Sequence, residues 1–380
     1  MNQPIRLAFN ATALLSPLTG IGQYSYHLAH EILVRQDIDA EFFYGAFWDR
    51  QLRASPSTLA SALPWLRRHL PYSYELRRWL QSFRFDRHAK RYRFDVYHEP
   101  NILRLPFDGP SVVTVHDLSW IRYPEAHPAE RVRAMNRYFE TGLKLASAII
   151  TDSLFVKQEL IDVFGVAPSS ISAIPLGVAP GFIPLAEEQT REVLKRHQLI
   201  HGQYFLSVGT LEPRKNLVFA LQAYQRLPAR VRQRFPMVII GMKGWHTSAI
   251  EQQMSALEKT GQLRRLDYVP RAELSTLMAG ALALVYPSIY EGFGLPPLEA
   301  MACGVPVICA NASSLPEVVG DTGVLIDPLC PDELVEALMR AAEGDLSQSG
   351  NLARARERAM NFTWANCAGR TVEVYRSICP

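Results

Sequence analysis

The sequence predicts an α/β protein with two doubly wound domains, each a parallel sheet covered by helices on both faces. Short apolar, β-rich runs alternate with amphipathic segments of helix length, the usual pattern of such sheets. Six runs fall in each half of the chain, so two sheets fit better than one very wide sheet. The length of 380 residues also exceeds that of one ordinary domain.

The predicted strands can be placed from these runs. They begin near Ile5, Ala40, Asp95, Ser111, Ala148 and Ser172 in the first half, and near Tyr204, Met237, Arg265, Leu282, Pro306 and Gly323 in the second. A solenoid is excluded, because no period of roughly 20–50 residues repeats. The predicted linker is Val178–Thr190, where proline and glycine precede a polar helix start. The domains are therefore expected over residues 1–180 and 181–360.

Composition is that of an ordinary globular protein, with 48% hydrophobic and 20% charged residues. A formal net charge of +3 excludes a histone-like polycation. Five cysteines without a CxxC pair make a poor disulfide framework and a poor zinc site, which favours a reducing compartment. No apolar run approaches the ~18 residues of a membrane-spanning helix, and the N-terminus is typical of a strand rather than a signal peptide. We therefore expect a cytoplasmic protein.

The segment Pro287–Ile308 is the most informative part of the sequence. A predicted strand end is followed by the loop Gly292-Phe293-Gly294-Leu295 and a helix that two prolines open. Backbone N–H groups and a helix dipole meet there, which suits an anion. Glu291 and Glu299 flank this point, and since carboxylates repel phosphate we expect them to bind the hydroxyls of a sugar or ribose. The structural alternative is that Glu299 only complements the helix N-terminus, worth ~0.3–1 kcal/mol.

A second motif, SVGTLEPRKNL, places two cations at the start of a helix. Gly209 ends a predicted strand, and Arg214 and Lys215 precede the next helix, where they could hold a diphosphate. A solvated basic pair on an exposed turn is the alternative.

Two motifs in the first half lie where open α/β sheets bind ligands. His116 closes an apolar run, and Asp117 could orient it or cap the next helix; a structural, hydrogen-bonded histidine is the equal alternative. Gly20-Ile21-Gly22 opens an amphipathic helix and half-matches a dinucleotide fingerprint, but Ser25 occupies the third glycine position. A glycine loop near a phosphate or a sugar is therefore favoured over an NAD site.

Taken together, these residues resemble the GT-B retaining glycosyltransferases of family 4, over essentially the whole chain. EGFGLPPLEAMACGVPVI is similar to the E-x7-E signature of that family, and VGTLEPRKN, PLGV, TVHDLSW and FTWANCAGRTVEVY are similar to its other landmarks. The subgroup with TGIGxY, TVHDLSW and GTLEPRKN looks like bacterial mannosyltransferases that build O-antigen or exopolysaccharide repeat units.

The resemblance implies two Rossmann-like domains facing across a cleft. The first, residues 1–180, would bind the acceptor and the second, residues 181–360, the nucleotide sugar. A last helix, residues 361–380, would cross back to the first domain.

The resemblance also implies roles for residues of the donor site. Glu291 would contact the donor sugar and Glu299 the ribose, while Lys215, Arg214 and the amides around Phe293–Leu295 would hold the diphosphate. One departure matters, because Thr210 stands where many relatives have arginine. Arg214 or Lys243 is expected to compensate. His116 would lie beside the transferred sugar, and Gly20–Gly22 would border the acceptor or the donor phosphate.

Two acidic motifs are set aside as metal sites. Asp37-Ile38-Asp39 spells the DxD that holds a metal in some sugar transferases, but it lies at a helix-to-strand turn. His98-Glu99 lacks the second histidine of an HExxH site, and no GxSxG hydrolase motif occurs. We therefore expect no metal and no cofactor beyond the nucleotide sugar.

The resulting hypothesis is retaining transfer of α-mannose from GDP-mannose onto a lipid-linked oligosaccharide, in bacterial surface polysaccharide synthesis. Another donor, such as UDP-glucose or GDP-fucose, or a GT-B-like nucleotide-sugar epimerase, is the alternative. Nucleic acid is not an expected partner.

A local charge imbalance suggests a further partner. Between Arg67 and Arg93 lie nine Lys or Arg residues and two acids, a net charge of +7, interleaved with aromatic residues. Such a stretch suits an anionic membrane surface, and a solvated basic face is the equal alternative. The expected membrane contacts are Arg77, Arg78, Trp79, Arg84 and Arg87. We therefore expect a cytoplasmic protein that is peripheral at the inner face of the plasma membrane.

Overall fold

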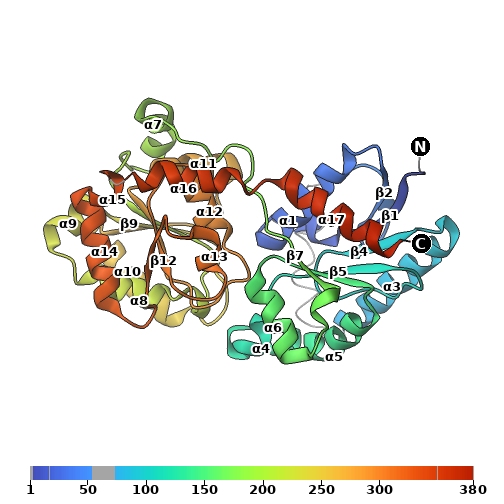
Figure 1. Cartoon of the computed structure of the whole chain (residues 1–380). Helices are drawn as coiled ribbons and strands as arrows, with labels where there is room; N and C mark the ends of the chain where they lie inside the picture. The colour runs from blue at the N-terminus through green and yellow to red at the C-terminus, as the bar shows by residue number, and fades with distance from the viewer. Residues whose placement is uncertain (1–2, 17, 54–72, 349, 380) are drawn as a thin grey trace. The chain divides into compact units, whose positions relative to one another are not determined.

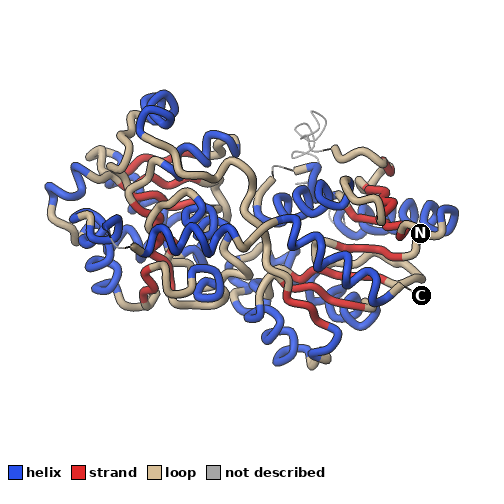
Figure 2. The backbone as a smooth tube through the Cα atoms, turned by 45° about the horizontal axis from the view of Figure 1, so that its top comes forward, coloured by secondary structure: helices blue, strands red, loops and turns tan. Residues whose placement is uncertain are grey.

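The computed structural model describes residues 3–16, 18–53, 73–348 and 350–379, which divide into two compact units. Unit 1 comprises Met1–Leu118, Arg133–Gly177 and Trp364–Pro380, and unit 2 comprises Ser119–Val132 and Val178–Thr363. Each unit contains one sheet with helices packed on it (Figures 1 and 2). The predicted fold class, two doubly wound α/β domains, is confirmed.

The observed division differs from the predicted one in one segment. The breaks after Gly177 and after Thr363 lie within three residues of the predicted boundaries at 180 and 360. Ser119–Val132, however, groups with unit 2, although the sequence places it in the first domain. One reason is that the ring of Tyr123 packs against Tyr290, with their centroids 5.5 Å apart.

The sheet of unit 1 has seven strands in the order β3-β2-β1-β4-β5-β6-β7. They are β1 (Ile5–Asn10), β2 (Ile38–Phe43), β3 (Trp48–Asp49), β4 (Val96–Glu99), β5 (Ser111–Val115), β6 (Ala148–Thr151) and β7 (Ile171–Ala173). All six predicted runs of the first half form strands. The sequence missed β3, a two-residue edge strand antiparallel to β2 and too short to show a pattern. Every residue of β5 is buried, as expected for a strand covered on both faces.

Helices cover this sheet. They are η1 (Thr12–Leu15), α1 (Gly20–Leu33), α3 (Ser73–Tyr92), most of α5 (Ala129–Leu145), α6 (Leu154–Phe164), η3 (Pro168–Ser170) and α17 (Trp364–Ile378). The last helix, α17, lies along α1 and contacts β5 and β6 (Figure 1).

A buried chain of hydrogen bonds fastens α17 to the sheet of unit 1. The Tyr375 hydroxyl bonds His98 Nδ1 at 2.6 Å, His98 Nε2 bonds the Thr114 hydroxyl at 2.8 Å, and Thr114 bonds Tyr24 at 2.9 Å. Burial lowers the pKa of His98 to about 3, so its imidazole is neutral. The histidine of the His98-Glu99 motif therefore has a structural role.

The sheet of unit 2 has six parallel strands in the order β10-β9-β8-β11-β12-β13, and all six were predicted. They are β8 (Phe205–Val208), β9 (Met237–Ile240), β10 (Leu263–Leu266), β11 (Ala283–Tyr286), β12 (Val307–Ala310) and β13 (Val324–Ile326). The helices are α4 (Ser119–Arg122), η2 (Pro124–Ala126), α7 (Glu187–Arg196), η4 (Pro213–Lys215), α8 (Leu217–Gln225), α9 (Ala229–Arg234), α10 (Ser248–Glu258), α11 (Arg271–Ala279), α12 (Leu295–Ala302), α13 (Leu315–Val319), α14 (Pro331–Glu343), α15 (Asp345–Gln348) and α16 (Asn351–Met360). The large core of unit 2 includes Phe205, Tyr224 and Leu338, all fully buried.

The loops that leave β8 and β9 approach each other very closely. A Cβ at Gly241 would lie 1.9 Å from the Gly209 carbonyl oxygen, so only glycine fits there. Gly209 itself has φ +152°. These two glycines bring the basic motif after β8 tightly against the sheet edge.

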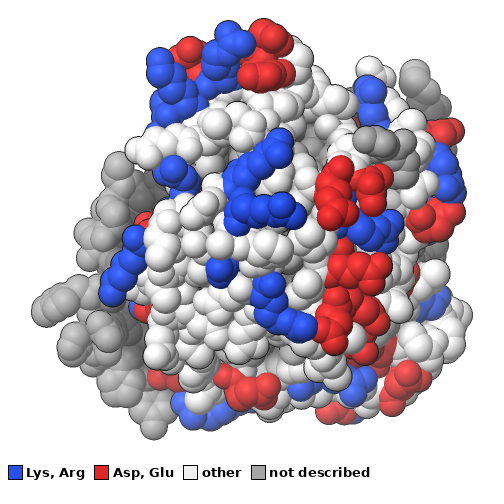
Figure 3. Space-filling model, turned by 90° about the vertical axis from the view of Figure 1, so that its left-hand side faces the viewer, with Lys and Arg blue, Asp and Glu red and all other residues white. Residues whose placement is uncertain are grey.

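Among the described residues, no helix is long and apolar enough to cross a membrane. On the face seen in Figure 3, basic and acidic side chains form separate small groups among uncharged atoms. This face therefore does not present the continuous positive surface of a nucleic-acid binder.

Candidate active site

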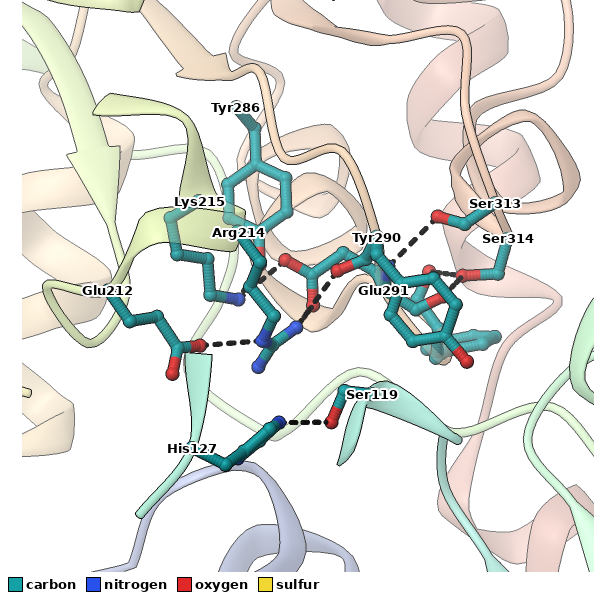
Figure 4. A network of polar contacts seen from close by, with 11 residues as sticks. Ser119, His127, Glu212, Arg214, Lys215, Tyr286, Tyr290, Glu291, Ser313 and Ser314 are labelled. Carbon is teal, nitrogen blue, oxygen red and sulfur yellow. Dashed lines mark hydrogen bonds and ion pairs between the residues drawn. The ribbon is translucent and has the colours of Figure 1, made fainter. Parts of the chain in front are cut away.

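Two cations and a carboxylate meet at the carboxyl edge of the unit 2 sheet. Lys215 Nζ lies 2.5 Å from Glu291 Oε1, and Arg214 Nη1 lies 3.1 Å from Glu291 Oε2. Lys215 also donates to the Tyr286 hydroxyl at 3.0 Å, and Arg214 Nε lies 2.7 Å from Glu212 Oε1. Figure 4 shows these side chains converging from two loops. The structure thus brings together three residues that the sequence singled out 76 and 77 positions apart.

Local backbone geometry explains this convergence. The loop after β8 forms η4, and Asn216 follows in the left-handed conformation with φ +55°, which turns the chain into α8. The loop after β11 is held by Ser313, whose hydroxyl accepts from the Glu291 amide at 2.9 Å, and by Ser314, which donates to the carbonyl of Glu291. Both loops leave adjacent parallel strands, so they meet at one edge.

The electrostatics keep this cluster ionised. Burial alone would raise the pKa of Glu291, but Lys215 and Arg214 outweigh it and lower the pKa to about 2. Burial lowers the pKa of Lys215, and the Glu291 carboxylate opposes that change. Glu291 is therefore a hydrogen-bond acceptor at neutral pH. The two cations, held in place by carboxylates, could exchange these partners for a diphosphate.

The loop before α12 has the form expected of an anion site. Gly294 has φ +116°, no side chain caps α12, and Pro296 and Pro297 carry no N–H, so the backbone donors at this helix start are those up to Leu295. Uncapped amides at a helix N-terminus attract negative charge. Phe293 is buried, and the Ser314 hydroxyl donates to its carbonyl at 2.8 Å, which fixes the loop.

Glu299 lies one turn into α12 and is 1% exposed. Its Oε1 pairs with Arg271, a residue that sequence reasoning missed. Burial raises the pKa of Glu299, and Arg271 opposes this rise. The signal available in the sequence was weak, since Arg271 follows a predicted strand by several residues and belongs to no motif.

The structure distinguishes the two residues expected to replace an arginine at position 210. Arg214 shares Glu291 with Lys215, whereas the ammonium group of Lys243 lies 2.8 Å from Glu251 and its side chain is 58% exposed. Arg214 is thus the second cation of the cluster, whereas Lys243 pairs with Glu251.

In unit 1, the His116 side chain is buried. Its Nε2 donates to the Pro100 carbonyl at 2.8 Å, and its Nδ1 lies 2.7 Å from Asp152 Oδ2. Burial would lower the pKa of His116, but Asp152 outweighs it and raises the pKa. Both ring nitrogens therefore have partners within the protein, and burial also raises the pKa of Asp152. Asp152 directly follows β6, and the sequence did not assign it a role.

The Pro100–Ile102 turn, which is bonded to His116 through the Pro100 carbonyl, is strained. Ile102 has φ +64°, which a β-branched residue rarely adopts. Besides His116, Glu99 holds this turn, since it accepts from the Asn101 amide at 3.1 Å. Glu99 also accepts from Asn10, and burial raises its pKa to about 7. Strain held by several partners is common near ligand sites.

The glycine loop at the start of α1 leaves open space. A Cβ at Gly20 would have no atom within 4 Å, whereas one at Gly22 would lie 3.2 Å from the Leu18 side chain. No side chain caps the N-terminus of α1, which begins at Gly20. Asp117 lies directly after His116 and contributes to raising its pKa.

The basic stretch includes α3, while Arg67, Arg68 and the side chain of Arg77 lie outside the described residues. Arg78 was expected to contact a membrane, and the structure gives its guanidinium group partners within unit 1. Its guanidinium donates to the carbonyls of Leu103 and Arg104 and lies 4.6 Å from the Tyr138 ring centroid. Buried carbonyls and an aromatic face satisfy it, so it serves the fold.

No group of three or more His, Cys, Asp or Glu residues in the described ranges could hold a metal ion. Asp37 of the DxD motif pairs with Arg35 and with Arg376 of α17. The motif therefore contributes to the turn and to the attachment of α17.

Comparison with known proteins agrees with this geometry. The family described as "Glycosyltransferase Family 4" matches residues 18–182, and "Glycosyl transferases group 1" matches residues 191–360. The O-antigen chain mannosyltransferase B of Escherichia coli is 36% identical over 380 residues, covering 98% of this chain and 100% of that protein. The chain therefore belongs to the family 4 glycosyltransferases.

Solved structures share the fold of this glycosyltransferase at low sequence identity. Sucrose-phosphate synthase from Thermosynechococcus elongatus has a TM-score of 0.76 at 19% identity and covers 99% of both chains. WaaG, a glycosyltransferase involved in lipopolysaccharide biosynthesis, has a TM-score of 0.74 at 15% identity and covers 98% of this chain and 99% of its own. The architecture is therefore that of the GT-B glycosyltransferases.

Proposed function

We propose that this glycosyltransferase moves α-mannose from GDP-mannose onto a lipid-linked oligosaccharide, with retention of configuration, in bacterial surface polysaccharide synthesis. The cluster of Lys215, Arg214 and Glu291 carries the proposal. Breaking a sugar–phosphate bond leaves negative charge on the diphosphate, and fixed cations stabilise such developing charge by several kcal/mol. The 36% identity to a mannosyltransferase supports the choice of sugar.

The donor would enter the unit 2 site by exchanging partners. Its diphosphate would take over Lys215 and Arg214, helped by the amides of Phe293 to Leu295 at the start of α12. Glu291, released from its ion pairs, would then accept hydrogen bonds from hydroxyls of the mannose, and Glu299 would accept them from the ribose. In this proposal the protein's cations, rather than a metal ion, neutralise the leaving group.

A transfer assay tests the assignment. Mannose transfer from GDP-mannose to a lipid-linked acceptor should fall at least ~100-fold in Glu291→Ala. Lys259→Ala, an exposed substitution in the same unit, should transfer normally. Full transfer by Glu291→Ala would refute the site, while no transfer by the wild type with GDP-mannose but turnover of UDP-glucose or GDP-fucose would refute the donor. Addition of EDTA should leave the rate unchanged.

We also propose that α3 brings unit 1 to an anionic membrane surface. Among its described residues, Leu76, Trp79, Leu80 and Phe83 are exposed, apolar and spaced as one helical stripe. Arg84, Arg87 and Arg91 are exposed on the same helix. An apolar stripe with basic residues is typical of helices that lie in a lipid interface. Each cation near such a surface contributes ~1 kcal/mol.

Vesicle sedimentation tests this proposal. Wild-type protein should bind vesicles that contain phosphatidylglycerol, bind less as salt is raised, and bind weakly to phosphatidylcholine alone. Arg84→Gln with Arg87→Gln should reduce binding about tenfold or more. The matched pair Arg226→Gln with Arg230→Gln, exposed in unit 2, should not. Equal binding by both double variants would overturn the proposal.

A further inference from the structure

Arg271 lies beside the expected ribose ligand. It is the first residue of α11, and its Nη2 donates to Oε1 of Glu299 on α12. Its guanidinium carbon lies 4.6 Å from the centroid of the Phe182 ring. The Arg271 side chain is 31% exposed, whereas that of Glu299 is 1% exposed. The ion pair is thus buried at its carboxylate end and open at its guanidinium end.

Arg271 keeps hydrogen-bonding capacity in reserve. Within the described residues, its hydrogen bond to Glu299 Oε1 comes from Nη2, and its buried Nε has no partner. A guanidinium has five N–H donors in a planar fork, so one bond to Glu299 leaves enough for a two-point contact. The ring of Phe182 restricts the plane of this fork. Such spare capacity on a half-open arginine points to a ligand.

We propose that Arg271 is the base-recognition residue of the donor site, donating two hydrogen bonds to neighbouring acceptors of a guanine base. The inference rests on the proposed function, in which Glu299 accepts from the ribose. In a nucleoside diphosphate the group attached beyond the ribose, away from the phosphates, is the base. Arg271 is in direct contact with Glu299, the expected ribose ligand, so it lies beside the part of the ligand to which the base is attached.

The chemistry of the fork selects guanine among the bases. The O6 and N7 atoms of guanine are adjacent acceptors and match an arginine bidentately. Adenine offers one acceptor beside an N6 donor on that edge, and the two carbonyls of uracil are separated by the N3–H donor, so each base would leave a donor of Arg271 unpaired. Because Arg271 also neutralises Glu299, base and ribose recognition are coupled through one ion pair.

Calorimetric titration with GDP, 7-deaza-GDP and UDP tests the inference. 7-Deaza-GDP keeps O6 but lacks the N7 acceptor. Arg271→Ala should weaken GDP binding about tenfold or more, and should weaken 7-deaza-GDP and UDP clearly less, since these two lose only the support that Arg271 gives to Glu299 and the ribose. Arg271→Lys keeps a positive charge beside Glu299 but loses the fork, so it should also weaken GDP more than 7-deaza-GDP. Arg226→Ala, which breaks another Arg–carboxylate pair in unit 2, should bind all three like the wild type.

The outcomes separate this inference from the proposed function. Wild-type protein that binds none of the three nucleotides would refute the proposed donor class. Wild-type protein that binds GDP, combined with equal losses for GDP, 7-deaza-GDP and UDP in Arg271→Ala, would overturn only the role in base recognition and leave Arg271 as a support of Glu299. Tighter binding of UDP than of GDP by the wild type would overturn the inference as well. A thermal melt of each variant checks that unit 2 remains folded.

Discussion

The carboxyl edges of the two sheets carry similar residue types in opposite arrangements. In unit 1, His116 and Glu99 bond the backbone of the Pro100–Ile102 turn and so stabilise the fold itself. In unit 2, Lys215 and Glu291 bond mainly each other through side chains, which can change partners without moving a strand. A parallel sheet can thus have a closed carboxyl edge, whose side chains bond the fold itself, or an exchangeable one, whose side chains can change partners. Only the exchangeable edge is suited to binding and releasing a charged ligand.

The largest expected effect tests the exchangeable edge. Lys215→Ala should lower kcat for sugar transfer ~100- to 1,000-fold, because it removes a buried cation from the leaving group and leaves Glu291 with one partner. Lys243→Ala should cost no more than a few-fold, since its ammonium group pairs with Glu251. Steady-state kinetics of both variants measure the difference. Equal losses would mean that Lys243, and not only Lys215, holds the diphosphate.

The next effect tests how tightly the unit 2 edge is built. Gly241→Ala should destabilise the protein by about 3 kcal/mol or more, because its Cβ would meet the Gly209 carbonyl. Gly369→Ala is the matched control, since Gly369 lies within α17 with open space around its Cβ position, and alanine should stabilise that helix by up to ~1 kcal/mol. Urea denaturation of both variants gives the free energies of unfolding. A neutral Gly241→Ala would show that the two loops can separate.

A smaller effect concerns the neutral histidine of unit 1. The pKa of His98 is lowered to about 3 in the folded state, so the unfolded state binds a proton first as pH falls below about 6.5. This histidine should therefore cost the wild type about 2 kcal/mol of stability between pH 7.5 and pH 5. His98→Gln should flatten the acid side of the stability profile. An unchanged profile would mean that other groups control acid unfolding.

The smallest effect has the opposite sign and concerns His116. Its pKa is raised, so its stabilising pairing with Asp152 is complete at acidic pH and is lost as pH rises through the folded pKa. The stability difference between the wild type and His116→Gln should therefore shrink by ~1 kcal/mol on the alkaline side. The titratable groups around it are Asp152, Asp117, His98 and Tyr24. A difference that grows with pH would contradict the pairing.

Much of the fold and part of the candidate site could be predicted because they depend on local patterns. Strands of buried, β-rich residues can be predicted from their composition, whereas the two-residue β3 cannot. Glu291 and Lys215 stood out because glycines, prolines and helix starts surround them in sequence. Arg271 and Asp152 did not, since neither belongs to such a motif. The hydrogen bond between Arg78 and the Arg104 carbonyl was not predicted, because charge counts do not reveal which carbonyls lie near a guanidinium group.

The sequence by itself determined the two-sheet α/β architecture, the family and the residue types available at each sheet edge, because periodicity and short motifs act over a few residues. Only the tertiary structure decided which of those residues became partners. Lys215 meets Glu291 across 76 positions, and Arg271 meets Glu299 across 28. His116 is held by Asp152, a residue 36 positions away. Such pairings depend on strand order, which brings distant loops to one edge of a sheet. The pairings decide whether a charged side chain stabilises the fold or can exchange its partner for a ligand.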